Sequence, residues 1–178
     1  MTQLVNEQEQ QEAVKALTDL ISVPSFNQPA EDGAPFGRGI RNALDKMMEI
    51  CKDLGFKTYE DPNGYYGYAE VGEGDKVFGV ICHLDTVPAG DPKTWEHDPF
   101  KGTVVNDAVY GRGSQDDKGP GIAALFAVKA LMDHGYKFNQ RISSSTELMK
   151  KSFGGELLST TRRKVKLIVV FLLMLNFH

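Results

Sequence analysis

Hydrophobic residues recur at helical spacing in two stretches near the start of the chain. In residues 8–21 the apolar positions lie three or four residues apart until Pro24 ends the pattern: Val14, Leu17, Leu20 and Ile21. Residues 40–54 repeat this spacing with Leu44, Met47, Met48 and Cys51. Gly55, directly after them, is typical of a helix C-terminal cap. The pattern therefore predicts two amphipathic helices.

Patterns of strand length come next. Residues 57–60 and 66–71 predict two short strands, because the Asp61-Pro62-Asn63-Gly64 sequence between them is typical of a turn. Residues 76–82 contain a continuous apolar run, which predicts a strand buried on both faces. After a loop region rich in Pro and Gly, the Ala- and Leu-rich residues 122–132 predict a third helix. This order of elements predicts an α/β layered fold.

The character of the sequence changes from Ser143 onward. A Ser/Thr cluster, a basic cluster at residues 162–166 and the apolar run 167–175 lie side by side without amphipathic periodicity. The apolar run has nine residues, whereas a helix needs about 20 to cross a bilayer. We therefore predict no membrane association. The same run has the composition of an aggregation-prone segment, with high β-propensity, no charge and no proline.

Composition narrows the class of protein. Hydrophobic residues make up 41% and charged residues 25% of the 178 residues, as in ordinary globular proteins. The formal net charge of −4 gives no basic surface for a phosphate backbone, so we predict no nucleic-acid binding. The two cysteines form neither a disulfide framework nor a CxxC zinc motif. The polar N-terminus lacks a secretion signal, so we expect a cytoplasmic protein.

A His-x-Asp motif follows the predicted buried strand. In extended chain the side chains of His83 and Asp85 point the same way, so they emerge together at the carboxyl end of the strand. A metal-ligating histidine usually donates its second N–H to an oxygen that fixes its tautomer, and Asp85 can serve as that acceptor. The alternative is a strand-terminal histidine beside a capping aspartate. The motif alone leaves both interpretations open.

A second motif combines adjacent carboxylates with glycines. Asp116 and Asp117 lie in a segment with four glycines, and neighbouring carboxylates repel each other unless a cation neutralises them. A divalent metal could supply that cation. The alternative is a solvated acidic loop at the N-terminus of the third helix, where aspartates are favourable. Phosphate binding is less well supported, because neither GK[ST] nor GxGxxG occurs.

The loop between the two motifs contains Trp95, the single tryptophan of the chain. Trp95 could line a substrate pocket, although a tryptophan flanked by prolines more often packs its loop onto the core. His97 and His134 are predicted to be surface residues.

Taken together and in order, VICHLDTVPAGDPKTWEHDPF and VYGRGSQDDKGPGIAALFAVKAL resemble the di-zinc peptidase superfamily of aminoacylases, acetylornithine deacetylases and carnosinase-like dipeptidases. The segments LISVPSF and GRGSQDDKGP resemble bacterial dipeptidases of broad specificity. The resemblance covers about residues 8–142. It implies the N-terminal part of a zinc-exopeptidase-type catalytic domain, with a central mixed sheet flanked by helices, and it implies that this domain is incomplete.

The resemblance also implies roles for individual residues. His83 matches a ligand of one zinc ion, Asp116 matches the carboxylate that bridges both zinc ions, and Asp85 matches the catalytic residue that orients His83. The peptide bond between Asp116 and Asp117 is expected to be cis. The implied cofactor is two Zn²⁺ ions, and the implied substrate is a dipeptide or a small N-acyl amino acid. A glutamate general base and three further metal ligands are expected downstream of Arg141. No oligomeric state is implied.

The sequence departs from the family after residue 142. Where the family shows a Gly-Thr-Asp-Glu-Glu-like motif, residues 147–151 read Glu-Leu-Met-Lys-Lys. Codons for these five residues, read one base earlier, permit Gly-Thr-Asp-Glu-Glu. Residues 170–178 similarly permit Gly-Phe-Ser-Pro-Asp-Ala-Glu-Phe-Pro, another family-like stretch. We therefore predict two regions, a partial zinc-peptidase catalytic domain over residues 1–142 and an out-of-frame translation over residues 143–178.

Three functional hypotheses remain at this stage. The first is an enzyme, the N-terminal part of a zinc-dependent dipeptidase. The second is a catalytically inactive truncated fragment with at most weak metal binding, because two ligands without a general base cannot assemble the reaction. The third is a small interaction module, and the acidic surface is the only feature that supports it. Hydrolysis in the presence of zinc separates the first from the others, and metal stoichiometry separates the second from the third.

Overall fold

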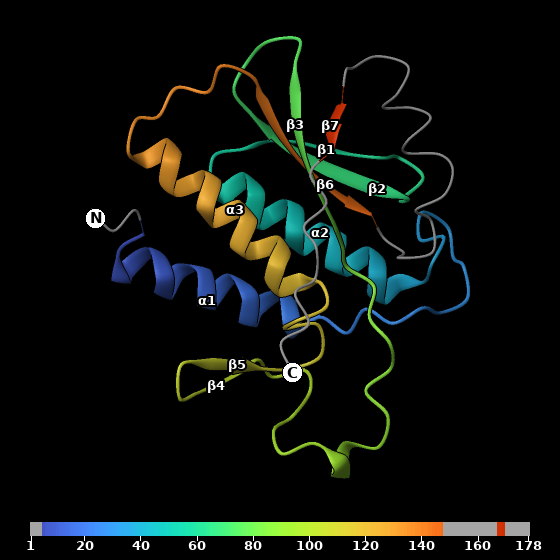
Figure 1. Cartoon of the computed structure of the whole chain (residues 1–178). Coiled ribbons are helices and arrows are strands. Elements are labelled where there is room, and N and C mark those ends of the chain that lie inside the picture. The colour runs from blue at the N-terminus through green and yellow to red at the C-terminus, as the bar shows by residue number, and fades with distance from the viewer. Residues whose placement is uncertain (1–4, 148–166, 170–178) are drawn as a thin grey trace.

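The computed structural model of the chain describes residues 5–147 and 167–169 (Figure 1). Three α-helices are formed by α1 (Glu7–Ile21), α2 (Arg38–Asp53) and α3 (Lys118–Asp133). The main sheet contains β1 (Lys57–Glu60), β2 (Tyr66–Val71), β3 (Val77–His83), β6 (Arg141–Glu147) and β7 (Leu167–Val169). A separate hairpin consists of β4 (Thr103–Val105) and β5 (Ala108–Tyr110), and a 3₁₀ turn, η1, spans Pro92–Thr94.

The main sheet is mixed, with the strand order β1-β2-β6-β3-β7. β1 pairs antiparallel with β2, and β2 pairs antiparallel with β6. β3 lies parallel to both β6 and β7. The register places Cys82 opposite Thr146, so the last residues of β3 lie beside β6. The predicted central mixed sheet is thus confirmed, and β3 is an inner strand of it.

The helices form layers beneath the sheet. α2 packs against β1 and β2, α3 packs against β3, and α1 packs against α3 on the side away from the sheet (Figure 1). The core between them is built from the apolar faces that the spacing predicted, including Leu44, Met47 and Met48 of α2. Gly121 allows α3 to approach the sheet closely, because a Cβ there would lie 3.1 Å from the Cys82 Sγ.

Helix boundaries follow from local chemistry. α1 begins after Asn6, whose side chain accepts a hydrogen bond from the Glu9 N–H while the Glu9 carboxylate accepts one from the Asn6 N–H. This capping box satisfies two N–H groups that a helix start leaves free. Beyond the C-terminus of α2, Gly55 has a φ of 86°, a left-handed conformation that favours glycine. The predicted cap at Gly55 is confirmed.

Two local predictions differ from the structure. α3 begins at Lys118, before Pro120, whereas the sequence pattern predicted a start near residue 122. Proline is tolerated in a first helical turn, because its missing N–H would have no partner there. The β4–β5 hairpin lies in a stretch predicted as loop. Its turn residues Asn106 and Asp107 have φ of 48° and 60°, as a two-residue hairpin turn requires.

The boundary predicted at residue 142 falls inside a strand. β6 runs from Arg141 to Glu147 and pairs with β2 and β3 along this length. Most of the segment predicted to be out of frame, including residues 148–166 and 170–178, lies outside the described residues. The reading-frame hypothesis therefore stays a prediction. Within the described part of the chain, no helix is long and apolar enough to cross a membrane.

Candidate metal and substrate site

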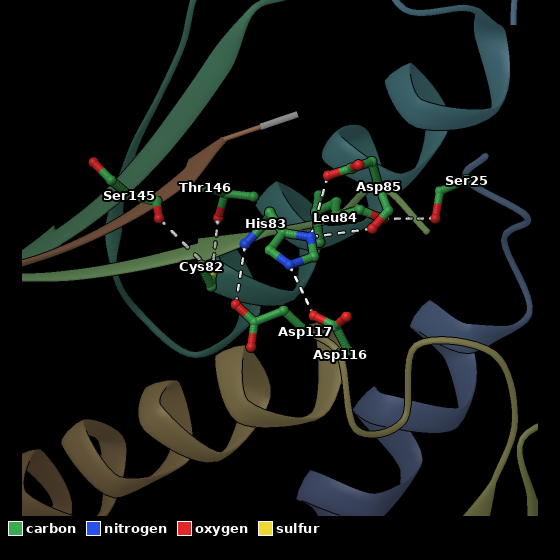
Figure 2. Close-up of polar contacts among 9 residues, drawn as sticks. All are labelled: Ser25, Cys82, His83, Leu84, Asp85, Asp116, Asp117, Ser145 and Thr146. Carbon is green, nitrogen blue, oxygen red and sulfur yellow. Dashed lines mark hydrogen bonds and ion pairs between the residues drawn. The ribbon is translucent and has the colours of Figure 1, made fainter. Parts of the chain in front are cut away.

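His83 lies at the C-terminal end of β3. It is the last residue of this strand, and its side chain is buried, with 5% exposed. The chain continues through Leu84 and Asp85, and Ser25 from the α1–α2 connection holds this segment. The Ser25 hydroxyl donates to the Leu84 carbonyl at 2.7 Å (Figure 2). The Thr86 N–H donates to the Ser25 carbonyl at 2.9 Å. Ser25 thus fixes the segment that carries Asp85.

The His83 ring lies between two carboxylates (Figure 2). Its Nδ1 is 3.1 Å from the Asp85 Oδ1 and 3.1 Å from the Asp85 carbonyl oxygen. Its Nε2 is 3.0 Å from the Asp116 Oδ1. The structure thus brings together the three site residues that the resemblance implied, with Asp85 at the Nδ1 and Asp116 at the Nε2 of the ring.

Asp116 and Asp117 lie in the loop directly before α3. The peptide bond between them is cis, as the resemblance implied. The Asp117 carboxylate accepts a hydrogen bond from the His83 N–H at 3.3 Å, while the Asp116 carboxylate faces the imidazole and is half exposed. Gly119 permits this loop to close, because a Cβ at that position would lie 1.9 Å from the Ser114 carbonyl oxygen. The Asp117 carboxylate thus binds the backbone at the end of β3, and the Asp116 carboxylate contacts the His83 ring.

The charges around His83 favour a cation. Burial, the largest influence, lowers the pKa of His83, but the hydrogen bond with Asp85 raises it. The charges of Asp85, Asp117 and Asp116 raise it further, and together these effects outweigh burial, so the pKa lies above its ordinary value. The site therefore stabilises positive charge at the imidazole.

The donor chemistry of His83 and Asp116 fits a divalent metal ion. When the Nδ1–H donates to Asp85, a neutral imidazole presents the lone pair of Nε2 to the Asp116 carboxylate, so two acceptors face each other. A proton or a metal ion between them removes this conflict. Zinc bonds of about 2.0–2.2 Å to each atom are compatible with such a pair. Among the described residues, no group of three or more His, Cys, Asp or Glu side chains is arranged to hold a metal.

The buried Lys118 stabilises the loop that carries Asp116 and Asp117, and the sequence analysis did not predict this role. Its side chain is 1% exposed, and its ammonium donates to the carbonyls of Leu20 at 3.0 Å and Val23 at 2.8 Å. Burial lowers the pKa of Lys118 to about 8. The lysine therefore fastens the loop of Asp116 and Asp117 to the C-terminal end of α1. A lysine next to two aspartates gives no sequence signal of burial.

A pocket of about 380 Å³ opens beside the His83 ring. Its walls come from the end of β3, from the Trp95 loop and from the glycine-rich segment before α3, and they include Asp85, Thr86, Trp95, Arg112 and Asp116. This volume lies within the range of about 300–1,000 Å³ that is typical of small-molecule sites. Trp95 both packs its loop and lines the pocket. His97 is half-buried and contacts Tyr110, whereas His134 is exposed as predicted.

The sequence profile of peptidase family M20/M25/M40 matches residues 79–144, which contain both motifs and all three predicted site residues. The chain is related to peptidase family M20/M25/M40. This relationship confirms the family resemblance read from the two motifs. It also agrees with the geometry, because the matched segment contains most of β3, the pocket loops, all of α3 and the first four residues of β6.

Several relatives of this chain are bacterial proteins that carry the provisional name of dipeptidase. One from Staphylococcus haemolyticus is 47% identical over 128 residues, which are 71% of this chain and 27% of the relative. One from Staphylococcus aureus is 41% identical over 138 residues, which are 76% of this chain and 29% of the relative. The chain thus spans less than a third of the length of these curated relatives.

Solved structures share the fold. Human carnosine dipeptidase 1 has a TM-score of 0.70 and 23% identity, and the match covers 88% of this chain and 36% of that protein. An M20 family metallo-carboxypeptidase from Sulfolobus solfataricus has a TM-score of 0.70 and 26% identity, with 85% of this chain and 34% of that protein covered. The described residues therefore have the fold of part of such a peptidase domain.

Proposed function

We propose that this chain carries part of a zinc-dependent site that hydrolyses dipeptides or small N-acyl amino acids. The contact between the His83 Nε2 and the Asp116 Oδ1 carries the proposal, because it pairs two metal-binding atoms from the two motifs. The relatives named as dipeptidases support a peptide substrate. The metallo-carboxypeptidase supports metal dependence.

Each residue has a distinct role in this proposal. His83 and Asp116 would hold zinc, and the complete family site takes two ions. Asp85 keeps the Nδ1–H of His83 as a donor and so leaves the Nε2 lone pair for the metal. Asp117 holds the end of β3 through the His83 N–H. Bound zinc would lower the pKa of a water molecule and polarise the scissile carbonyl.

The complete reaction needs groups beyond these. A general base contributes about 10²–10⁴ in rate, and the family resemblance assigns this glutamate and three further ligands to positions downstream of Arg141. A second candidate function is therefore a catalytically inactive fragment with weak metal binding. The observation in its favour is that the described residues contain no cluster of three metal-binding side chains.

A paired assay tests the proposal. The 178-residue chain and a version with the reading frame restored after residue 142 are incubated with dipeptides and added zinc. We expect hydrolysis by the restored version and none by the 178-residue chain. Equal activity of both would contradict the assignment of essential groups to the restored region. No activity of a folded, zinc-loaded restored version would contradict dipeptide hydrolysis.

The nucleotide sequence around codons 140–150 tests the reading-frame hypothesis independently of any assay.

We also propose that the protein is located in the cytoplasm, and cell fractionation would test this prediction.

A further inference from the structure

The pocket beside His83 is lined by acidic residues and by one arginine, Arg112. The acidic residues Asp85 and Asp116 both contact the His83 ring. Arg112 forms no ion pair within the described part of the chain, and its guanidinium lies 4.8 Å from the centre of the Trp95 ring. The face of an aromatic ring attracts a cation placed over it, which favours this position of the guanidinium. Arg112 is therefore a pre-positioned cation within the pocket.

The tryptophan under this cation is itself fixed. Its indole N–H donates to the Ala89 carbonyl at 2.8 Å, and the preceding turn is capped by Asp91, whose side chain accepts from the Lys93 N–H at 3.0 Å. The Trp95 face is thus held toward Arg112. A second pocket residue, Tyr110, contacts the ring of His97 edge to face. Trp95 and Tyr110 are thus each held by a contact with a neighbouring loop residue, and such pre-positioning lowers the entropic cost of binding a ligand.

Two buried polar atoms of residues that line the pocket lack a protein partner within the described part of the chain. Within the described residues, neither the Arg112 Nε nor the Thr86 Oγ1 has a hydrogen-bond partner, although both atoms are buried. Thr86 is only 8% exposed and lines the same pocket. Buried polar groups are normally satisfied, so unsatisfied ones beside a pocket point to a bound polar molecule. One guanidinium and one hydroxyl together suit an anion with two oxygen acceptors.

We propose that Arg112, stacked on Trp95 and assisted by Thr86, binds the free carboxylate of an amino-acid or short-peptide ligand. This inference deepens the proposed function, on which its biological meaning rests, because it assigns one group of the ligand to Arg112 in the pocket that His83 and Asp116 also line. It makes a free terminal carboxylate, rather than a side chain, the group that the pocket selects.

Trp95 offers a direct assay, because it is the only tryptophan in the chain. Its fluorescence is followed while the chelator-treated, zinc-free 178-residue protein is titrated with N-acetylglycine or with N-acetylglycinamide at matched ionic strength. The two probes share the acyl-amide group and differ in the carboxylate. We expect N-acetylglycine to bind at least about tenfold more tightly, as the loss of a charge-assisted hydrogen bond implies.

Variants separate recognition from folding. Arg112→Met is expected to abolish the preference for the acid, and Arg112→Lys to retain part of it, because lysine keeps the charge but not the planar pair of donors. Arg38→Met is the matched control, since Arg38 is exposed and pairs with Glu31. It should bind both probes as the unchanged chain does. Circular dichroism verifies that each variant is folded.

The binding results test the carboxylate subsite, and the hydrolysis assay tests the proposed function, so failure of one can be told from failure of the other. Equal binding of both probes, no saturable signal with either, or an undiminished acid preference in folded Arg112→Met would overturn the carboxylate subsite. These results would leave zinc-dependent hydrolysis by the restored version intact. Conversely, a clear acid preference without any hydrolysis by the restored version would support the subsite and contradict the proposed function.

Discussion

The His83 Nε2 lies 3.0 Å from the Asp116 Oδ1, although 33 positions separate the two residues in the chain. β3 ends at His83, and the loop before α3 folds back over that end (Figure 2). A hydrogen bond from the His83 N–H to Asp117 holds the same loop. One histidine thus links the central strand and the carboxylate loop through both its ring and its backbone.

Asp85→Ala should weaken zinc binding without unfolding the chain. Asp85 holds the Nδ1 of His83 at 3.1 Å, and loss of such an orienting carboxylate typically lowers metal affinity or activity about 10–100-fold. Titration with zinc by calorimetry measures the change. Asp75→Ala, which removes an exposed carboxylate outside the site, should bind zinc normally. Unchanged affinity in Asp85→Ala would exclude the orienting role.

Much of the architecture was predictable because the core pattern is local. The spacing of Leu44, Met47 and Met48 determines which face of α2 is buried, and Gly55 marks its end. The β4–β5 hairpin was missed, although Asn106 and Asp107 are turn residues. Its strands have only three residues each, too few for alternation to be evident.

The candidate site was predictable only in part. His83, Asp85 and Asp116 lie in motifs with recognisable chemistry, so their convergence could be foreseen. Ser25 and Lys118 act through contacts 59 and 98 positions away, which no local pattern reveals. Arg112 appears in a glycine-rich segment as an ordinary loop residue. Its position against Trp95 depends on how two loops pack.

Lys118→Met should destabilise the fold despite the preserved length of the side chain. The Val23 carbonyl would lose the Lys118 ammonium as a donor, whereas the Leu20 carbonyl would keep the hydrogen bond from the Val23 N–H. A buried acceptor left unsatisfied costs about 1–3 kcal/mol. Urea denaturation gives the change in the free energy of unfolding. Lys15→Met, at an exposed pair with Asp19, should change it by less than about 1 kcal/mol. A Lys118→Met chain as stable as the control would refute the anchoring role.

Cys51 should resist alkylation in the folded chain. Burial, followed by the nearby Cys82, raises the pKa of the Cys51 thiol from 9.0 to about 12. Since the thiolate is the nucleophile, labelling with iodoacetamide at pH 8 should be at least about 100-fold slower than in guanidinium chloride. Mass spectrometry identifies the labelled peptide. A Val104→Cys variant supplies an exposed thiol on β4 that should react rapidly in the same folded protein. Equal rates at both positions would show that Cys51 is accessible.

Zinc titration of the 178-residue chain, of His83→Ala and of His134→Ala tests the central claim most directly. His134 is exposed at the end of α3, so its removal controls for the loss of any imidazole. If His83 and Asp116 form the metal-binding pair, the unchanged chain and His134→Ala bind zinc alike, and His83→Ala binds it at least about 100-fold more weakly. Zinc binding by a folded His83→Ala chain with the affinity of the unchanged chain would contradict the account.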